Sequence, residues 1–172
     1  MLIKSERYID AIEPLERAVR LSKKQEWQID LIDVYIKLGI YNEAKALVDQ
    51  LISQESSEGL LRRKAKILFL TGNYEDALSI YKELPQDEYI KDRIAMCYFN
   101  LGNIEEALKW EREALQLNER WVVGLVNIST ILAKMGRLDE SLEYLKKALE
   151  LEPENESVKK NLKLLREAME DR

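Results

Sequence analysis

The sequence predicts an all-α solenoid of antiparallel helix pairs, closed at its C-terminal end by one capping helix. Three observations predict this fold. A glycine recurs every 30 to 34 residues, apolar residues lie at helical spacing on both sides of each glycine, and small residues recur at fixed distances from it. A period of this length is typical of stacked supersecondary units.

The recurring glycines mark the turn inside each helix pair. They are Gly39, Gly72, Gly102 and Gly136. Glycine adopts the left-handed conformation that ends a helix at little cost, so each is expected to end one helix and begin a tight turn. Five positions later stand Ala44, Ala77, Ala107 and Ser141, and seven positions earlier stand Ala65, Ala95 and Ser129, with Ile32 as the exception. We expect these small residues to face each other where the two helices of a pair cross closely.

The first element is predicted to be a half-unit over residues 1–24. Its segment 7–21 has the apolar spacing of the second helix of a pair, and the matching first helix would precede Met1. Pro14 lies inside this helix and removes a backbone hydrogen bond, so we expect a kink or a split there.

Four complete units and a capping helix follow in one domain, 1–172. The units are predicted at 25–57, 58–87, 88–121 and 122–155, and the capping helix at 156–172. Residues that commonly start helices precede them, such as Ser57 and Asp87. The 58–87 unit is shorter than the others, and Pro85 is expected to end its second helix about one turn early. The last helix would cover the apolar end of the stack with Val158, Leu162 and Leu165.

The repeated pattern resembles that of the tetratricopeptide repeat family. The small positions match, and the bulky position of the first helix holds Tyr35, Leu68, Tyr98 and Leu132, whereas the family's unit-ending proline is present only as Pro153. The resemblance implies a right-handed α-α superhelix that acts as a scaffold or adaptor for protein partners. It implies no catalytic chemistry of its own.

The resemblance also implies a peptide-binding groove lined by the first helices. Transferring the family's groove positions gives Ile29, Ile36, Arg62, Lys66, Phe69, Tyr89, Met96, Phe99, Val123 and Val126. An apolar row of this kind at exposed positions is typical of a binding surface, so a protein or peptide partner with apolar anchors is predicted. The alternative is a helix register shifted by one residue, in which case these side chains face neighbouring helices.

The family's clamp for the C-terminal carboxylate of chaperone tails is not reproduced. Its positions hold Arg62 and Lys66 in one unit, Met96 in the next, and Val123 and Asn127 in the third. The sequence therefore argues against binding of Hsp70 or Hsp90 tails.

Composition narrows the remaining function classes. The net charge is −5 and the longest basic run is three residues, which argues against nucleic acid. No apolar run has the length of a membrane span, and one cysteine fits a reducing compartment, so a cytoplasmic protein without a membrane partner is expected.

Catalysis, cofactors and metals are not expected. Histidine, the commonest general base and metal ligand, is absent. The remaining candidates are Cys97, the pair Glu105 and Glu106, and the acidic run from Glu152 to Glu156. A lone cysteine is usually a core residue, and acids at a helix start usually complement the helix dipole.

Self-assembly is the alternative function. The half-unit at residues 1–24 would leave an uncapped N-terminal face through which a homo-oligomer could form. Trp27 and Trp110 are aromatic residues of the kind that anchor such interfaces.

Overall fold

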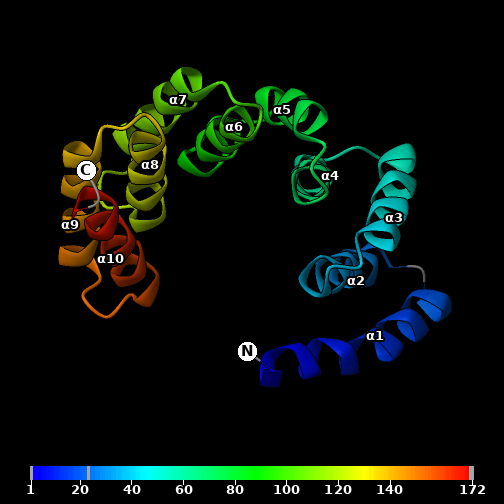
Figure 1. The fold of residues 1–172 in the computed structure, drawn as a ribbon. Helices are drawn as coiled ribbons and strands as arrows, with labels where there is room; N and C mark the ends of the chain where they lie inside the picture. Colours follow the sequence, from blue (N-terminus) through cyan, green and yellow to red (C-terminus); the bar gives the residue numbers. More distant parts are fainter. Residues whose placement is uncertain (1, 23, 171–172) are drawn as a thin grey trace. The chain divides into compact units, whose positions relative to one another are not determined.

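The computed structural model describes the backbone of residues 2–22 and 24–170, and the side chains of 7–22 and 24–170. Over these residues it contains ten helices and no strands (Figure 1). They are α1 (Leu2–Ser22), α2 (Gln25–Leu38), α3 (Tyr41–Gln54), α4 (Glu58–Leu70), α5 (Tyr74–Glu83), α6 (Glu88–Asn100), α7 (Ile104–Leu117), α8 (Val122–Lys134), α9 (Leu138–Leu151) and α10 (Glu156–Glu170). The predicted all-α helical-repeat fold is confirmed.

The glycine turns are as the sequence predicts. Gly39, Gly72, Gly102 and Gly136 all have φ between 76° and 82°, the left-handed region in which a Cβ is unfavourable. Each turn joins a first helix of a pair (α2, α4, α6, α8) to a second helix (α3, α5, α7, α9).

The small residues are buried at the helix crossings. Ala95 and Ala107 are fully buried in α6 and α7. In the next pair, the hydroxyls of Ser129 and Ser141 lie 2.7 Å apart, and Ser141 also donates to the Ser129 carbonyl at 2.8 Å. Two serines can replace two alanines here because each hydroxyl has a partner inside the core.

Several predicted helix starts carry side-chain caps. Ser57 accepts a hydrogen bond from the Leu60 amide at 3.4 Å, and Asp87 accepts one from the Ile90 amide at 2.8 Å. Asn155 Oδ1 accepts from the Val158 amide at 3.1 Å. The helix starts after Lys24 and Trp121 have no side-chain cap.

Two expectations about prolines have different outcomes. Pro14 lies inside α1, which continues as one helix, so of the predicted kink or split the split is wrong and the kink stays a prediction. Near Pro85 the prediction is confirmed, because α5 has 10 residues where α3, α7 and α9 each have 14. Gln86 closes this early end by donating to the carbonyls of Tyr81 at 3.0 Å and Leu84 at 2.5 Å.

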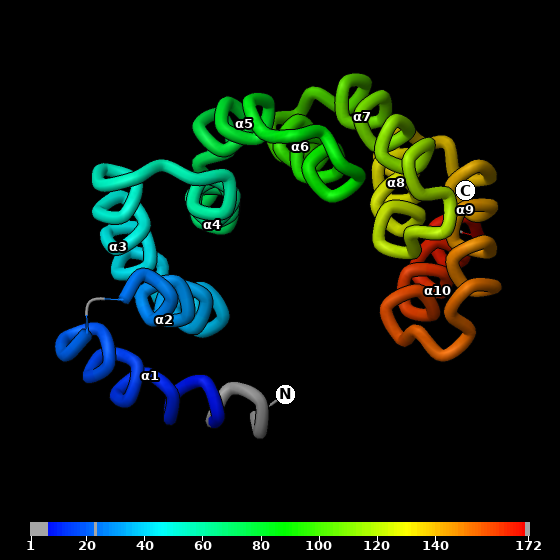
Figure 2. The backbone as a smooth tube through the Cα atoms, turned by 180° about the vertical axis from the view of Figure 1, so that it is seen from behind, coloured from blue at the N-terminus to red at the C-terminus, as the bar shows by residue number. Residues whose placement is uncertain are grey.

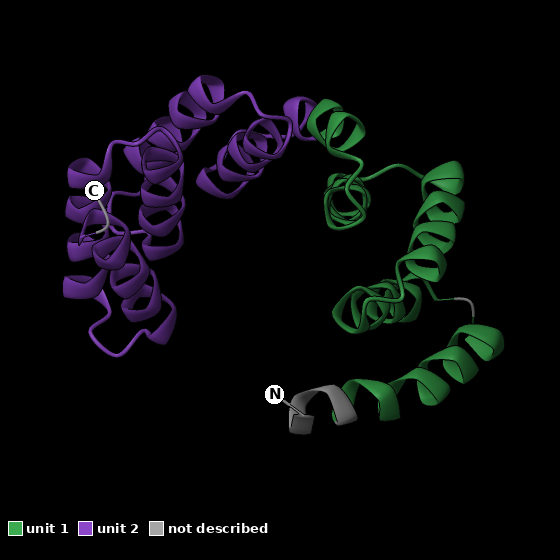
Figure 3. Cartoon of the chain, in the orientation of Figure 1, with its two compact units in different colours: residues 1–80 green, residues 81–172 purple. Residues whose placement is uncertain are grey.

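The chain forms two compact units, residues 1–80 (unit 1) and 81–172 (unit 2), with the boundary inside α5 (Figure 3). In unit 1, α1 packs on α2, and α3 packs on α2 and α4. Its core contains Ile32, Ile36, Ala44, Val48, Leu51, Leu60 and Ile67.

Unit 2 contains a larger continuous core. There α7 packs on α6 and α8, α9 packs on α8, and α10 covers α9 and touches α8 (Figure 2). Val158, Leu162 and Leu165 of α10 are buried in this core. In each unit a second helix thus packs beside the first helix that follows it, α3 beside α4 and α7 beside α8.

Candidate functional site: the first-helix surfaces

The predicted groove residues of unit 1 lie on α2 and α4. Ile29, Arg62, Lys66 and Phe69 are partly exposed. Ile36 is only 6% exposed and packs in the unit 1 core, so its predicted exposure to a partner is wrong. The four remaining residues are called here the first-helix surface of unit 1.

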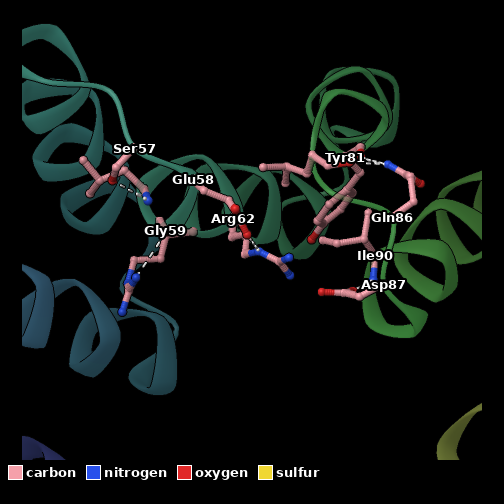
Figure 4. Close-up of polar contacts among 11 residues, drawn as sticks. Ser57, Glu58, Gly59, Arg62, Tyr81, Gln86, Asp87 and Ile90 are labelled. Carbon is pink, nitrogen blue, oxygen red and sulfur yellow. Dashed lines mark hydrogen bonds and ion pairs between the residues drawn. The ribbon is translucent and has the colours of Figure 1, made fainter. Parts of the chain in front are cut away.

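The charged groups of this surface are engaged with neighbouring side chains. Arg62 pairs with Glu58 one turn earlier at 2.8 Å, as the close-up in Figure 4 shows. Arg63, which the sequence analysis did not select, links α4 to α2 by donating to both carboxylate oxygens of Asp33 at 2.9 and 2.6 Å. The Phe69 ring meets Tyr74 edge-on at 5.5 Å between centroids.

The predicted groove residues of unit 2 lie on α6 and α8. Tyr89 and Val123 are 38% and 50% exposed. Met96, Phe99 and Val126 are partly buried and pack against the core. These five residues are called the first-helix surface of unit 2.

A hollow of about 250 Å³ lies between α8, α9 and α10, nearer the C-terminal end of α8 than Val126. Thr130 and Ala133 line it from α8, and Leu164 lines it from α10. Leu164 is 52% exposed, so the hollow offers apolar surface at its rim. A second hollow, of about 520 Å³, lies among α7, α8 and α9 and is lined by residues outside the predicted groove, including Arg112, Tyr144 and Lys147.

Polar groups beneath the unit 2 surface form a buried cluster. Asp92 of α6 is fully buried. Arg93 pairs with it and lies over the Tyr89 ring, 5.3 Å from the centroid. Asn127 of α8 donates to Asp92 Oδ1. Although burial opposes its charged form, Asp92 raises the pKa of the Arg93 guanidinium.

Glu111 of α7 completes the cluster and was not selected by the sequence analysis. It is fully buried, and its pKa is raised to about 9 by burial and by the adjacent Asp92. The sequence does carry a signal for it: Glu111 stands nine residues after the turn glycine, where the other units have Val48, Tyr81 and Leu145.

The cysteine and the acidic side chains are the residues considered above for catalysis or metal binding. Burial raises the pKa of the Cys97 thiol to about 12, so this cysteine is a poor nucleophile. Among the described residues, no group of three or more Cys, Asp or Glu side chains is arranged to hold a metal ion. Across the described ranges, no helix combines the length and apolar character needed to cross a membrane.

These features define a helical-repeat protein whose first helices present partly apolar surfaces. Tetratricopeptide repeat models match residues 29–92, 90–120 and 124–155. The chain belongs to the tetratricopeptide repeat family. Proteins of this family generally serve as scaffolds for protein interactions and are typically not catalysts.

Curated relatives match part of their own length only. The BBSome complex member BBS4 of Bos taurus is 32% identical over 109 residues, which is 61% of this chain and 21% of BBS4. The heat shock protein STI1 of Saccharomyces cerevisiae is 27% identical over 107 residues, which is 59% of this chain and 18% of STI1. The chain therefore spans about a fifth of the length of these relatives.

Solved structures share the fold over nearly the whole chain. A thermophilic TPR protein of Thermus thermophilus superposes with a TM-score of 0.79 at 23% identity, covering 95% of this chain and 93% of that one. YrrB, described as a TPR protein with an unusual peptide-binding site, superposes with a TM-score of 0.64 at 17% identity, covering 92% and 84%. At these identities the likeness concerns the fold alone.

Proposed function

We propose that the chain is a non-catalytic interaction module that binds an extended, apolar peptide segment of a partner protein on the first-helix surface of unit 2. The observation that carries the proposal is the exposure of Tyr89 and Val123 on consecutive first helices. Exposed apolar side chains beside partly buried ones offer contact area to an apolar side chain of a peptide. Without the peptide, water covers this area.

The charge distribution supports an apolar rather than a basic ligand. Helix α8 contains no acidic residue, and its single charged residue, Lys134, lies at its C-terminal end. On α6, the carboxylate of Asp92 is buried and paired with Arg93. Glu88, directly before Tyr89, is the other acid of α6 and is partly exposed, so α6 and α8 present one acidic side chain in a chain with a net charge of −5.

The first-helix surface of unit 1 is proposed as a second contact region. Phe69 supplies apolar area there, and Arg62 and Lys66 lie on the same helix. Peptide binding of this kind would need no cofactor.

Selection from a random peptide library tests this function directly. The full chain is used as bait, and the affinity of a selected peptide is measured by calorimetry for the wild type, Val123→Asp and Leu117→Asp. The two variants are matched, because Val123 and Leu117 are 50% and 55% exposed, but Leu117 ends the second helix α7.

We expect Val123→Asp to weaken binding at least tenfold and Leu117→Asp to change it by less than twofold, with both variants folded by circular dichroism. A ten-fold loss corresponds to about 1.4 kcal/mol, which is modest for burying a charge in an apolar contact. Equal affinities for all three proteins would refute the proposed surface.

Self-association is a second candidate, and α1 supplies the observation that favours it. Ile9 and Leu21 are 57% and 78% exposed on this helix, which packs on α2. Sedimentation of the wild type and Ile9→Asp decides the question. A wild-type dimer that dissociates in the variant supports association through α1, and a monomer in both cases rejects it.

A further inference from the structure

Helix α7 has an acid at a position where the repeat places a core residue. Nine residues after each turn glycine stand Val48, Tyr81, Glu111 and Leu145, and all four are at most 1% exposed. Glu111 therefore places a carboxyl group inside the core of unit 2. An ionised carboxylate in that environment is very unfavourable unless donors surround it.

Glu111 has no hydrogen-bond donor in the part of the chain that the structure describes. Among the described residues, no N–H or O–H group donates to either of its carboxyl oxygens. Its neighbour Asp92, in contrast, receives hydrogen bonds from Arg93 of α6 and Asn127 of α8. Of two adjacent buried carboxyl groups, only one has the partners that an ionised group needs.

Two ionised carboxylates cannot form a hydrogen bond, because neither has a proton to donate. A protonated carboxylic acid needs only an acceptor, and Asp92 is an acceptor in contact with Glu111. Protonation of Glu111 thus removes a buried charge and gives the pair a hydrogen bond at the same time.

We infer that Glu111 carries a proton in the folded chain at neutral pH and donates it to Asp92, so that α6, α7 and α8 are joined by a neutral, hydrogen-bonded cluster. With Asp92 negative, Arg93 positive and Glu111 and Asn127 uncharged, the four side chains have no net charge. The junction between these helices is therefore linked to the uptake of one proton.

The surrounding groups agree with this assignment. Burial is the largest influence on the pKa of Glu111 and raises it. Of the two charged groups on α6, Asp92 raises this pKa further and Arg93 lowers it. Tyr81 of α5 and Tyr89 and Cys97 of α6 are the other titratable groups near Asp92 and Arg93, and burial raises the pKa of Tyr81 and of Cys97. On α8, Asn127 is hydrogen-bonded to Asp92, and Gly124 lies close to Glu111. Neither of these two residues titrates.

Gly124 provides the space for this arrangement. A Cβ at this position would lie 3.1 Å from Glu111 Oε1 and 2.8 Å from the Trp121 ring. A glycine inside a helix is normally unfavourable, so its presence opposite the acid suggests that close approach of α8 to Glu111 is required.

The stability that the Glu111 proton contributes depends on pH. In the unfolded chain Glu111 loses its proton near its ordinary pKa, whereas in the folded chain the pKa is about 9. Between these values the folded state binds one more proton than the unfolded state. The stabilisation is complete at low pH and declines as the pH rises, with up to a tenfold increase in the unfolding equilibrium constant for each pH unit.

Carbon-13 NMR of protein labelled at the glutamate side-chain carboxyls tests the proton directly. We expect one glutamate signal to titrate several pH units above the others in the wild type and in Glu113→Gln, and to be absent in Glu111→Gln. Glu113 is the matched control because it lies on the same helix but pairs with Lys91 at 2.6 Å. If every glutamate of the folded protein titrates in the ordinary acidic range, the inference is wrong.

Unfolding by urea between pH 5 and 9 provides the second measurement. Relative to the wild type, Glu111→Gln and Glu111→Leu should lose the part of the increase in the unfolding constant with pH that comes from Glu111, while Glu113→Gln should keep it. Leucine is included because Leu145 occupies the same repeat position, so this variant is expected to fold. An unchanged pH dependence in both Glu111 variants would contradict the inference.

Discussion

Units 1 and 2 use the same repeat position to connect successive first helices, but in different environments. Arg63 and Asn127 both stand nine residues before a turn glycine, and each donates to an aspartate on the preceding first helix. In unit 1 the partner is Asp33, whose side chain is 48% exposed. In unit 2 it is Asp92, which is fully buried and also bound to Arg93.

From this difference we expect burial of the aspartate to set the energetic contribution of each link. An exposed ion pair gains little because water solvates both ions well when they separate. A buried carboxylate that loses its partner keeps the full cost of desolvation. We therefore expect unit 2 to depend on its polar cluster and unit 1 to keep its fold without its ion pair.

The largest expected effect is that of Arg93→Ala. The change leaves the buried Asp92 with Asn127 and Glu111 but without its cation, and should lower the free energy of unfolding by about 3–5 kcal/mol. Urea titration followed by circular dichroism measures the loss at pH 7. A loss below about 1 kcal/mol would mean that water screens the charge of Asp92 as effectively as it screens that of Asp33.

Two glycine substitutions, one in each unit, have the next largest expected effects and compare how closely α8 and α4 are packed. Gly124→Ala places a methyl group 2.8 Å from Trp121 and 3.1 Å from Glu111 and Leu115, so it should destabilise the chain by about 1–3 kcal/mol. Gly59→Ala in α4 meets Arg63 Nη1 at 3.5 Å, an ordinary contact. Because alanine favours a helix, Gly59→Ala should stabilise the chain by up to about 1 kcal/mol.

Thermal unfolding of the wild type and of the two alanine variants measures the two changes in stability, which should have opposite signs. If Gly124→Ala raises the melting temperature as much as Gly59→Ala does, then α8 does not need the close approach that the position of Glu111 implies.

The sequence was sufficient for the repeat and its turns because these depend on local rules. A residue without Cβ at Gly102 and small residues at Ala95 and Ala107 are required by the turn and by the helix crossing, whatever the rest of the chain does. Helix periodicity similarly predicted which face of α10 is buried.

The candidate surface was harder to predict because exposure depends on side-chain size as well as on position. Ile36, Phe69 and Phe99 all stand three residues before a turn glycine. The aromatic rings of Phe69 and Phe99 are partly exposed, whereas the shorter Ile36 is enclosed by the unit 1 core. Position in the repeat gives the direction of a side chain but not how far it extends beyond its neighbours.

The buried cluster could be predicted only in part. An acid at position 111, among apolar residues at the equivalent positions, signals an unusual environment. Its pairing with Asp92, 19 residues away, depends on how closely α6, α7 and α8 pack, and sequence spacing alone does not give that distance.

The smallest expected effect is that of Arg63→Ala in unit 1. Removal of the ion pair to Asp33 should cost about 0.5–1 kcal/mol, because both side chains retain contact with water in the folded state. Urea unfolding at low and at high salt measures it, and the cost should decrease at high salt as the ions are screened. A cost as large as that of Arg93→Ala, independent of salt, would remove the distinction between the two units and assign a structural role to both links.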